Sequence, residues 1–167
     1  MDLFGDNNNG AEFSPCGKYR YTLHRIWNEE LPLVMCIGLN PSTANADKND
    51  PTIRILRKHL SMLGYGGFYM CNLYAIISST PQILKYSEID LLKDNKLHFE
   101  STEIKCGNNV IFCWGAFKEV NKKRIDYIVR RYPNALCFGK TADGSPMHPM
   151  ALMYGGVQKA ELTPYTK

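Results

Sequence analysis

The apolar positions of the chain form short continuous runs, separated by stretches with helical spacing. Four runs are apolar at nearly every position, which is typical of strands buried on both faces of a parallel sheet; they are residues 33–39, 68–73, 110–114 and 135–138. Residues 19–23 alternate in the manner of a strand, and NEELP follows them as a turn. The pattern therefore predicts four core strands and one further strand near the N-terminus.

Helix signals lie between the predicted strands. Asp50 followed by Pro51 is the expected chemistry of a helix start, and apolar residues recur at helical spacing until Gly64. Further helices are expected after Ser79-Thr80-Pro81, from about 94 to 105, and from 117 to 131. We expect residues 1–15, which are rich in Asn and Gly, to be loosely ordered, and the end from Lys140 to be loop-rich.

Strands that alternate with helices fold as a parallel sheet with helices on both faces. We therefore expect a single domain over residues 1–167 with an α/β fold. Its predicted form is a three-layer α/β/α sandwich, with a central, mainly parallel four-stranded sheet and an N-terminal edge strand. No internal repeat and no linker interrupts the pattern.

Composition narrows the class of protein without naming a function. The 167 residues are 44% hydrophobic and 22% charged, as in globular proteins, and no apolar run approaches the ~20 residues that span a bilayer. The start, MDLFGDNNNG, lacks the basic and apolar pattern of a signal peptide, so we expect a cytoplasmic protein with no membrane partner. The net charge of +4 is compatible with a polyanionic partner but is not diagnostic of one.

The six cysteines predict core packing. Cys36, Cys71 and Cys113 lie inside apolar runs, where a thiol acts as a small hydrophobic group. No close cysteine pair has the spacing of a zinc or iron–sulfur site, and a disulfide framework is not expected in such a chain. Phosphate loops, dinucleotide fingerprints, nucleophile elbows and paired-histidine metal motifs are also absent from the sequence. We therefore expect no metal and no cofactor.

In α/β sheets of this kind, ligands bind outside the carboxyl ends of the strands. Four segments are predicted to meet at that edge: Asn40-Pro41-Ser42, Asn72-Leu73-Tyr74, Trp114-Gly115-Ala116 and the loop from Lys140 to His148. By topology alone, two asparagines, a tryptophan and a histidine converge there.

Each asparagine has a structural and a functional interpretation. Asn40 stands between a strand and a proline that aim its amide, although an asparagine there often caps its own turn. Asn72 lies within the apolar FYMCNLYAI, where a buried amide needs hydrogen-bond partners. Its donor and acceptor suit the edge of a base, and an amide that ties two loops together explains the pattern about as well.

His148 is the histidine best placed for chemistry, because its loop also contains a glycine and two prolines that fix the backbone. A histidine there can donate to a developing oxyanion or move a proton near neutral pH. Trp114 and Tyr74 are candidates for stacking on a base or sugar, although aromatic residues at strand ends more often only pack.

Across nearly its whole length the chain is similar to an uncharacterised bacterial and phage family, the domain-of-unknown-function family 1643. The stretches that carry the similarity are KYRYTLHRIW, GLNPSTANADKNDPT, GYGGFYMCNLYA, FCWGA and GKTADGSPMHP. Several long motifs in the right order make the resemblance specific. It implies no activity.

A more distant resemblance, to the uracil-DNA glycosylase superfamily, implies both a fold and an activity. GLNPS resembles the G-x-N-P-G motif of the mismatch-specific branch, which implies that Asn40 positions the attacking water. MCN resembles the L-L-N strand end of the uracil-specific branch, which implies that Asn72 reads the pyrimidine edge. VIFCWGA resembles a strand that ends in W-G, and the segment at His148 resembles a final loop containing H-P-S.

Two positions depart from that pattern and leave two functions open. Ser42 replaces the last glycine of the first motif, and Met150 replaces the serine after His-Pro, which removes a hydroxyl that would grip a phosphate. The first function is a glycosylase acting on a damaged or modified base in DNA. The second is a non-catalytic module that binds DNA, a nucleotide or a nucleobase. The candidate catalytic residues are Asn40 and His148, and the candidate substrate-binding residues are Pro41, Ser42, Asn72, Tyr74, Trp114, Gly115 and Lys140.

Overall fold

The computed structural model describes residues 8–45, 47–80, 92–118, 120–154 and 160–166. Their strands form one seven-stranded sheet in the order β1-β2-β4-β3-β5-β6-β7. The strands are β1 Asn8–Phe13, β2 Arg20–Ile26, β3 Leu33–Gly38, β4 Gly67–Asn72, β5 Val110–Phe112, β6 Leu136–Cys137 and β7 Thr163–Pro164. The helices in the described residues are α1 Pro51–Met62, α2 Leu92–Cys106, α3 Lys122–Arg131 and α4 Ala151–Tyr154. The predicted α/β class is confirmed.

The sheet is mixed and larger than the sequence pattern predicts. β3 pairs in parallel with β4 and with β5, and β5 pairs in parallel with β6. The remaining strands are antiparallel to their neighbours: β2 to β4, β1 to β2, and β7 to β6. The strand expected at the N-terminal edge, β2, therefore lies inside the sheet, because β1 covers its outer side.

Strand β1 corrects the expectation of loose order in residues 1–15 for its own residues 8–13, which are paired with β2; residues 1–7 lie outside the described ranges. The pairing runs from Asn8 opposite Ile26 to Phe13 opposite Arg20. Most β1 side chains are exposed or half-buried, so this edge strand needs backbone hydrogen bonds rather than apolar side chains. An Asn- and Gly-rich composition does not prevent that. β7 likewise forms within the segment predicted to be loop-rich.

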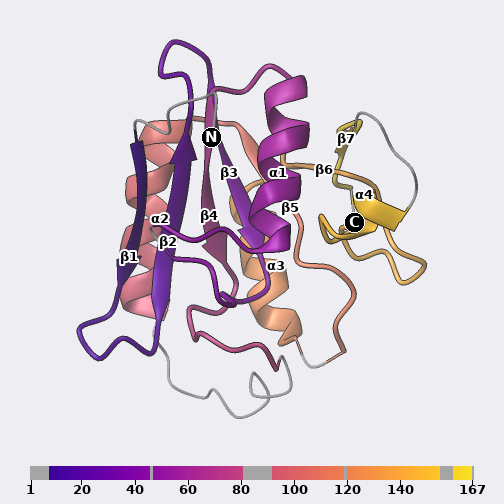
Figure 1. Cartoon of the computed structure of the whole chain (residues 1–167). Helices are drawn as coiled ribbons and strands as arrows, with labels where there is room; N and C mark the ends of the chain where they lie inside the picture. The colour runs from indigo at the N-terminus through magenta and orange to yellow at the C-terminus, as the bar shows by residue number, and fades with distance from the viewer. Residues whose placement is uncertain (1–7, 46, 81–91, 119, 155–159, 167) are drawn as a thin grey trace.

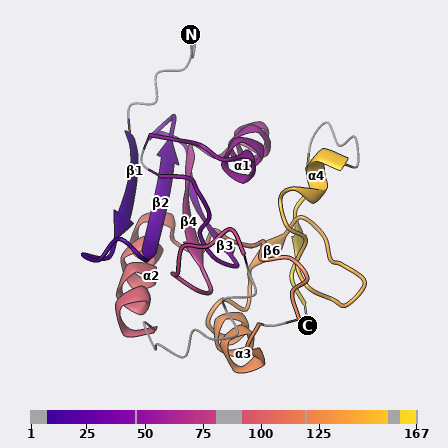
Figure 2. The same cartoon turned by 60° about the horizontal axis from the view of Figure 1, so that its bottom comes forward.

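Helices cover both faces of the sheet. α1 lies on one face, and α2 and α3 lie on the other (Figures 1 and 2). Because side chains of a strand alternate between faces, β3 contributes to both cores. Val34 and Cys36 pack in the cluster that includes α1, and Met35 and Ile37 pack in the cluster that includes residues of α2 and α3.

The helix starts follow from their capping residues. Asp50 is the N-cap of α1, where its Oδ1 accepts from the backbone amide of Ile53 at 2.9 Å, with proline following as predicted. α3 begins at Lys122 rather than 117, because the Asn121 side chain accepts from the Lys123 amide and caps the helix there. The short helix expected after Ser79-Thr80-Pro81 falls on residues outside the described ranges. Within those ranges, every helix is too short or too polar to cross a membrane.

Candidate functional site

A pocket of about 330 Å³ opens at the carboxyl ends of β3 and β4, beside the segment that follows β5. Six residues predicted from the sequence line it: Asn40, Ser42, Asn72, Trp114, Gly115 and His148. Three others do not line it, namely Pro41, Tyr74 and Lys140. The convergence expected from topology is therefore present for the two asparagines, the tryptophan and the histidine.

Asn72 is the last residue of β4, and its amide is buried in the pocket wall. The residue is 1% exposed, and neither its Nδ2 nor its Oδ1 has a hydrogen-bond partner among the described residues. The Oδ1 lies against the end of β3, because a Cβ built on Gly38 would come within 2.9 Å of it. A buried polar group without a partner destabilises the fold. This amide therefore has one donor group and one acceptor available to a molecule in the pocket.

Asn40 follows β3, and the nitrogen of its side-chain amide forms structural hydrogen bonds. Its Nδ2 donates to the carbonyl of Pro41 at 3.1 Å and to the carbonyl of Ser78 at 2.9 Å. The Ser78 amide in turn donates to the Pro41 carbonyl at 2.9 Å, so the loops after β3 and β4 are joined. Among the described residues, only the Nδ2 of Asn40 forms hydrogen bonds, and its Oδ1 forms none. Asn40 is thus a residue of the pocket wall with an unused acceptor.

His148 is held as a neutral side chain by its loop and by burial. Its Nδ1 accepts from the backbone amide of Met150 at 3.2 Å. Burial lowers the pKa of His148 below the ordinary value of 6.5, against a smaller opposite effect of Asp50. A neutral ring whose Nδ1 accepts carries its proton on Nε2. The side chain therefore offers an N–H donor at neutral pH.

Gly115 allows the segment after β5 to approach His148. Its φ of 78° lies in the left-handed region, which favours glycine, and a Cβ at this position would come 3.2 Å from the Cβ of His148. The Gly115 amide also donates to the carbonyl of Pro146 at 2.9 Å, in the loop that carries the histidine. A larger residue at 115 would displace His148.

Ser42 and Asp50 form a structural pair beside the pocket. The Ser42 hydroxyl donates to Oδ2 of Asp50 at 2.9 Å, while Oδ1 caps α1. Both carboxylate oxygens are therefore engaged. The serine at this position stabilises the helix start through Asp50.

The two aromatic candidates have different surroundings. Trp114 lines the pocket and packs on Phe112, with ring centroids 4.7 Å apart. Tyr74 is buried in the same apolar cluster as Trp114 but does not line the pocket. Its hydroxyl accepts from the Asn121 amide, and the Arg124 guanidinium lies 4.3 Å from its ring centroid. Only Trp114 is placed to contact a ligand in this pocket.

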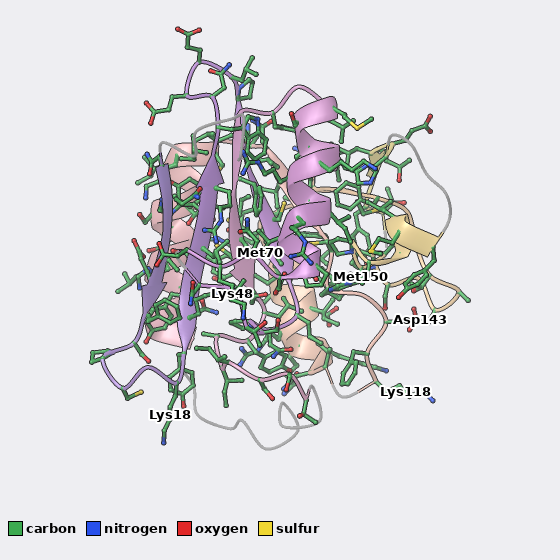
Figure 3. The ribbon with its side chains drawn as sticks, in the orientation of Figure 1. Lys18, Lys48, Met70, Lys118, Asp143 and Met150 are labelled. Carbon is green, nitrogen blue, oxygen red and sulfur yellow. The ribbon has the colours of Figure 1, made fainter. Side chains whose placement is uncertain are left out.

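A second hollow of about 710 Å³, here called the lysine groove, adjoins the pocket. The two share Trp114 and Phe117 in their walls. The groove is lined by three lysines and two aspartates, Lys118, Lys122, Lys140, Asp126 and Asp143, together with apolar and small polar residues. Figure 3 shows the Lys118 and Asp143 side chains projecting on the same side of the molecule. Lys140, a predicted substrate-binding residue, thus lies beside the pocket, where its Nζ donates to the carbonyl of Thr166.

Arg20 is a pocket residue that the sequence analysis assigned no role. It is 3% exposed and lines the pocket with Asn40 and Asn72. Its Nη1 donates to the carbonyl of Ala44 in the loop after β3, so the burial of this side chain depends on a segment distant in the sequence. The signal in the sequence is the single charge in YRYTL, which by itself does not indicate burial.

Comparison with known proteins gives one match. The model of a family described as protein of unknown function (DUF1643) matches residues 20–150. No curated protein and no solved structure matches the chain. The predicted resemblance to this family is confirmed, and the resemblance to uracil-DNA glycosylases stays a prediction.

Proposed function

We propose that this chain, which belongs to the DUF1643 family of proteins of unknown function, binds a nucleobase in its pocket and hydrolyses the N-glycosidic bond of a damaged or modified base in DNA. The observation that carries the proposal is the Asn72 amide, which is buried in the pocket wall without a partner among the described residues. Asn40 and His148 line the same pocket and supply an acceptor and a donor.

The base-recognition part of the proposal rests on matching polar groups. The edges of bases present donors and acceptors side by side, and a side-chain amide pairs with both kinds of group. In a site closed to water, an amide left unpaired is costly and one that is paired is strongly favoured. Asn72 therefore selects a ligand with such an edge, and Trp114 supplies an apolar wall.

The catalytic part assigns one role to each remaining group. Asn40 Oδ1 accepts a hydrogen bond from a water molecule and aims its oxygen at C1′ of the sugar. As the water oxygen bonds to C1′, the C1′–N bond breaks and its electron pair leaves with the base. The Nε2–H of neutral His148 donates to the base oxygen on which negative charge develops. The proton lost by the water passes to solvent or to the departing base.

One observation favours the second function, a binding module without chemistry. Asp50 is the one carboxylate in the pocket wall over the described residues, and both its oxygens are engaged by Ser42 and α1. The attacking water would then be activated by an amide alone. A module that only binds a base or nucleotide needs Asn72 but not Asn40 Oδ1.

Base release from DNA tests the catalytic proposal. Duplexes carrying uracil, hypoxanthine or 5-substituted pyrimidines are incubated with the protein, and free base is measured by chromatography. We expect release from at least one duplex, and about 100-fold or greater loss with Asn40→Ala or His148→Gln. Asn134→Ala, at an exposed asparagine outside the pocket, is the matched control.

Absence of release from every duplex by folded wild-type protein contradicts hydrolysis. Titration with nucleosides and single-stranded DNA then separates the two functions. A binding module still binds, and loses affinity with Asn72→Leu but not with Asn40→Ala.

A further inference from the structure

Arg20 is a buried cation in the pocket wall that the described residues leave incompletely bonded. Its Nη1 donates to the carbonyl of Ala44 at 2.5 Å, whereas its buried Nε has no hydrogen-bond partner. Within the described ranges, no carboxylate forms an ion pair with it. Asp50 attracts it from a greater distance, but the oxygens of Asp50 are bonded to Ser42 and to the helix start.

Arg25, on the same strand, shows what a purely structural buried arginine looks like in this fold. It is fully buried, and each of its three nitrogens donates to the chain: Nε to Asn49 Oδ1 at 2.7 Å, Nη1 to the His24 carbonyl at 2.8 Å, and Nη2 to the Asn45 carbonyl at 2.6 Å. Arg25 thus anchors the loop before α1. Among the described residues, Arg20 lacks such a set of partners, and it lines a pocket.

Buried charges in proteins are paired or hold a ligand, because removal from water is costly. Burial lowers the pKa of Arg20 to about 10, which leaves the guanidinium charged at neutral pH. Its planar array of N–H groups matches the oxygens of a phosphate or a carboxylate. The counter-charge that the described residues do not supply is therefore expected on the molecule that enters the pocket.

We propose that Arg20 binds an anionic group of the ligand, a phosphate or a carboxylate, inside the pocket. The inference rests on the proposed function, because the same molecule also presents its base edge to Asn72. It narrows the substrate class to nucleotides whose phosphate enters the pocket, or to bases that carry an acidic substituent. A neutral base whose phosphates all remain at the surface leaves Arg20 without a counter-charge.

The test compares neutral and anionic probes on the full chain by calorimetric titration. In the phosphate arm, each deoxynucleoside is compared with its 5′-monophosphate. In the carboxylate arm, uracil is compared with 5-carboxyuracil. We expect the anionic probe of at least one arm to bind about tenfold or more tightly than its neutral counterpart. Arg20→Gln is expected to remove that advantage. Arg20→Lys is expected to keep only part of it, because lysine retains the charge but lacks the planar, paired N–H donors of a guanidinium.

Arg130→Gln is the matched control, since Arg130 is an exposed arginine of α3 outside the pocket. It is expected to keep the full advantage of the anionic probe. Circular dichroism establishes that each variant is folded. If Arg20→Gln does not fold, the comparison of wild type with Arg20→Lys takes its place.

Three results overturn the inference: no anionic probe binds, neutral and anionic probes bind equally well to wild type in both arms, or a folded Arg20 variant retains the full preference. A failure of the proposed function looks different. In that case the anionic preference depends on Arg20, while Asn72→Leu leaves the affinity for every probe unchanged.

Discussion

A buried side-chain amide without partners destabilises a folded protein by about 1–3 kcal/mol, and Asn72 is such a group over the described residues. Leucine has a similar size and no polar atoms. We therefore expect Asn72→Leu to raise the free energy of unfolding of the unliganded protein by about 1 kcal/mol and to abolish base binding. Chemical denaturation and calorimetric titration measure the two effects.

Asn109→Leu is the control for this prediction, because Nδ2 of Asn109 donates to the backbone carbonyl of Leu33 at 3.1 Å. Its replacement breaks this hydrogen bond and is expected to lower stability. A similar loss of stability in Asn72→Leu contradicts the account, since it means that the amide has partners in the unliganded fold.

Because of His148, the protein is expected to lose stability as the pH falls. Its pKa in the folded state is lowered by burial, so its contribution is complete above the unfolded value of about 6.5 and is lost as pH falls through the folded pKa. We expect wild type to lose more stability than His148→Gln when pH is lowered below about 6.5. Urea denaturation at several pH values measures the difference.

His24 and His59 also have pKa values lowered by burial. Both histidines are present in wild type and in His148→Gln, so their contributions to the pH dependence of stability cancel when the two proteins are compared. Equal losses of stability in the two proteins contradict a neutral, half-buried His148.

Topology was enough to predict which residues share the pocket, but not their hydrogen bonds. Asn40, Asn72, Trp114 and His148 meet because parallel strands end at a common edge. Besides the adjacent Pro41 carbonyl, Asn40 donates to the carbonyl of Ser78, 38 positions away, and nothing local in the sequence indicates this second partner. The amide nitrogen of Asn40 therefore has a structural role, because it bonds to backbone carbonyls of its own turn and of a second loop. Asn72 does not join any loops among the described residues.

At the scale of the elements, β3 and β4 pair in parallel so that their ends meet, and the glycine that ends β3 leaves room there for the Asn72 side chain. A Cβ on Gly38 would lie 2.4 Å from Cε of Met70 and 2.9 Å from Oδ1 of Asn72. The methionine end is flexible, whereas the amide is confined. We expect Gly38→Ala to lower stability by about 1–3 kcal/mol through overpacking and to weaken base binding at least tenfold. Denaturation and titration of the same sample test both. Unchanged binding contradicts the placement of Asn72.

Elements with local signals were predictable, and those that depend on distant partners were not. The start of α1 follows from Asp50 and the proline after it, both adjacent in sequence. β1 has no apolar pattern and forms because β2 supplies its hydrogen bonds. The burial of Arg20 likewise depends on a distant segment, the loop after β3 with the carbonyl of Ala44, and could not be predicted from YRYTL alone.

At the scale of the whole molecule, the pocket continues into the lysine groove through Trp114 and Phe117. A nucleic-acid strand with one base in the pocket would place neighbouring phosphates along this groove. We expect Lys118→Gln and Lys122→Gln each to weaken DNA binding and to reduce the slope of log K against log salt by about 1. Fluorescence anisotropy at several salt concentrations measures the slope.

Lys58→Gln, at an exposed lysine of α1 outside the groove, is the control and should leave the slope unchanged. Binding of a mononucleoside should be unaffected in all three variants. Equal slopes in wild type and the groove variants contradict a path for DNA along the groove.

The central claim is that the Asn72 amide receives its missing hydrogen bonds from a base. The most direct measurement is nuclear magnetic resonance of the side-chain amide of Asn72 in isotope-labelled protein, with its signals identified by their loss in Asn72→Leu. On saturation with the tightest-binding probe of the titrations, we predict that these signals shift more than those of the exposed Asn134 and that their exchange with solvent slows. A bound base or nucleotide that leaves the Asn72 signals unmoved contradicts the account.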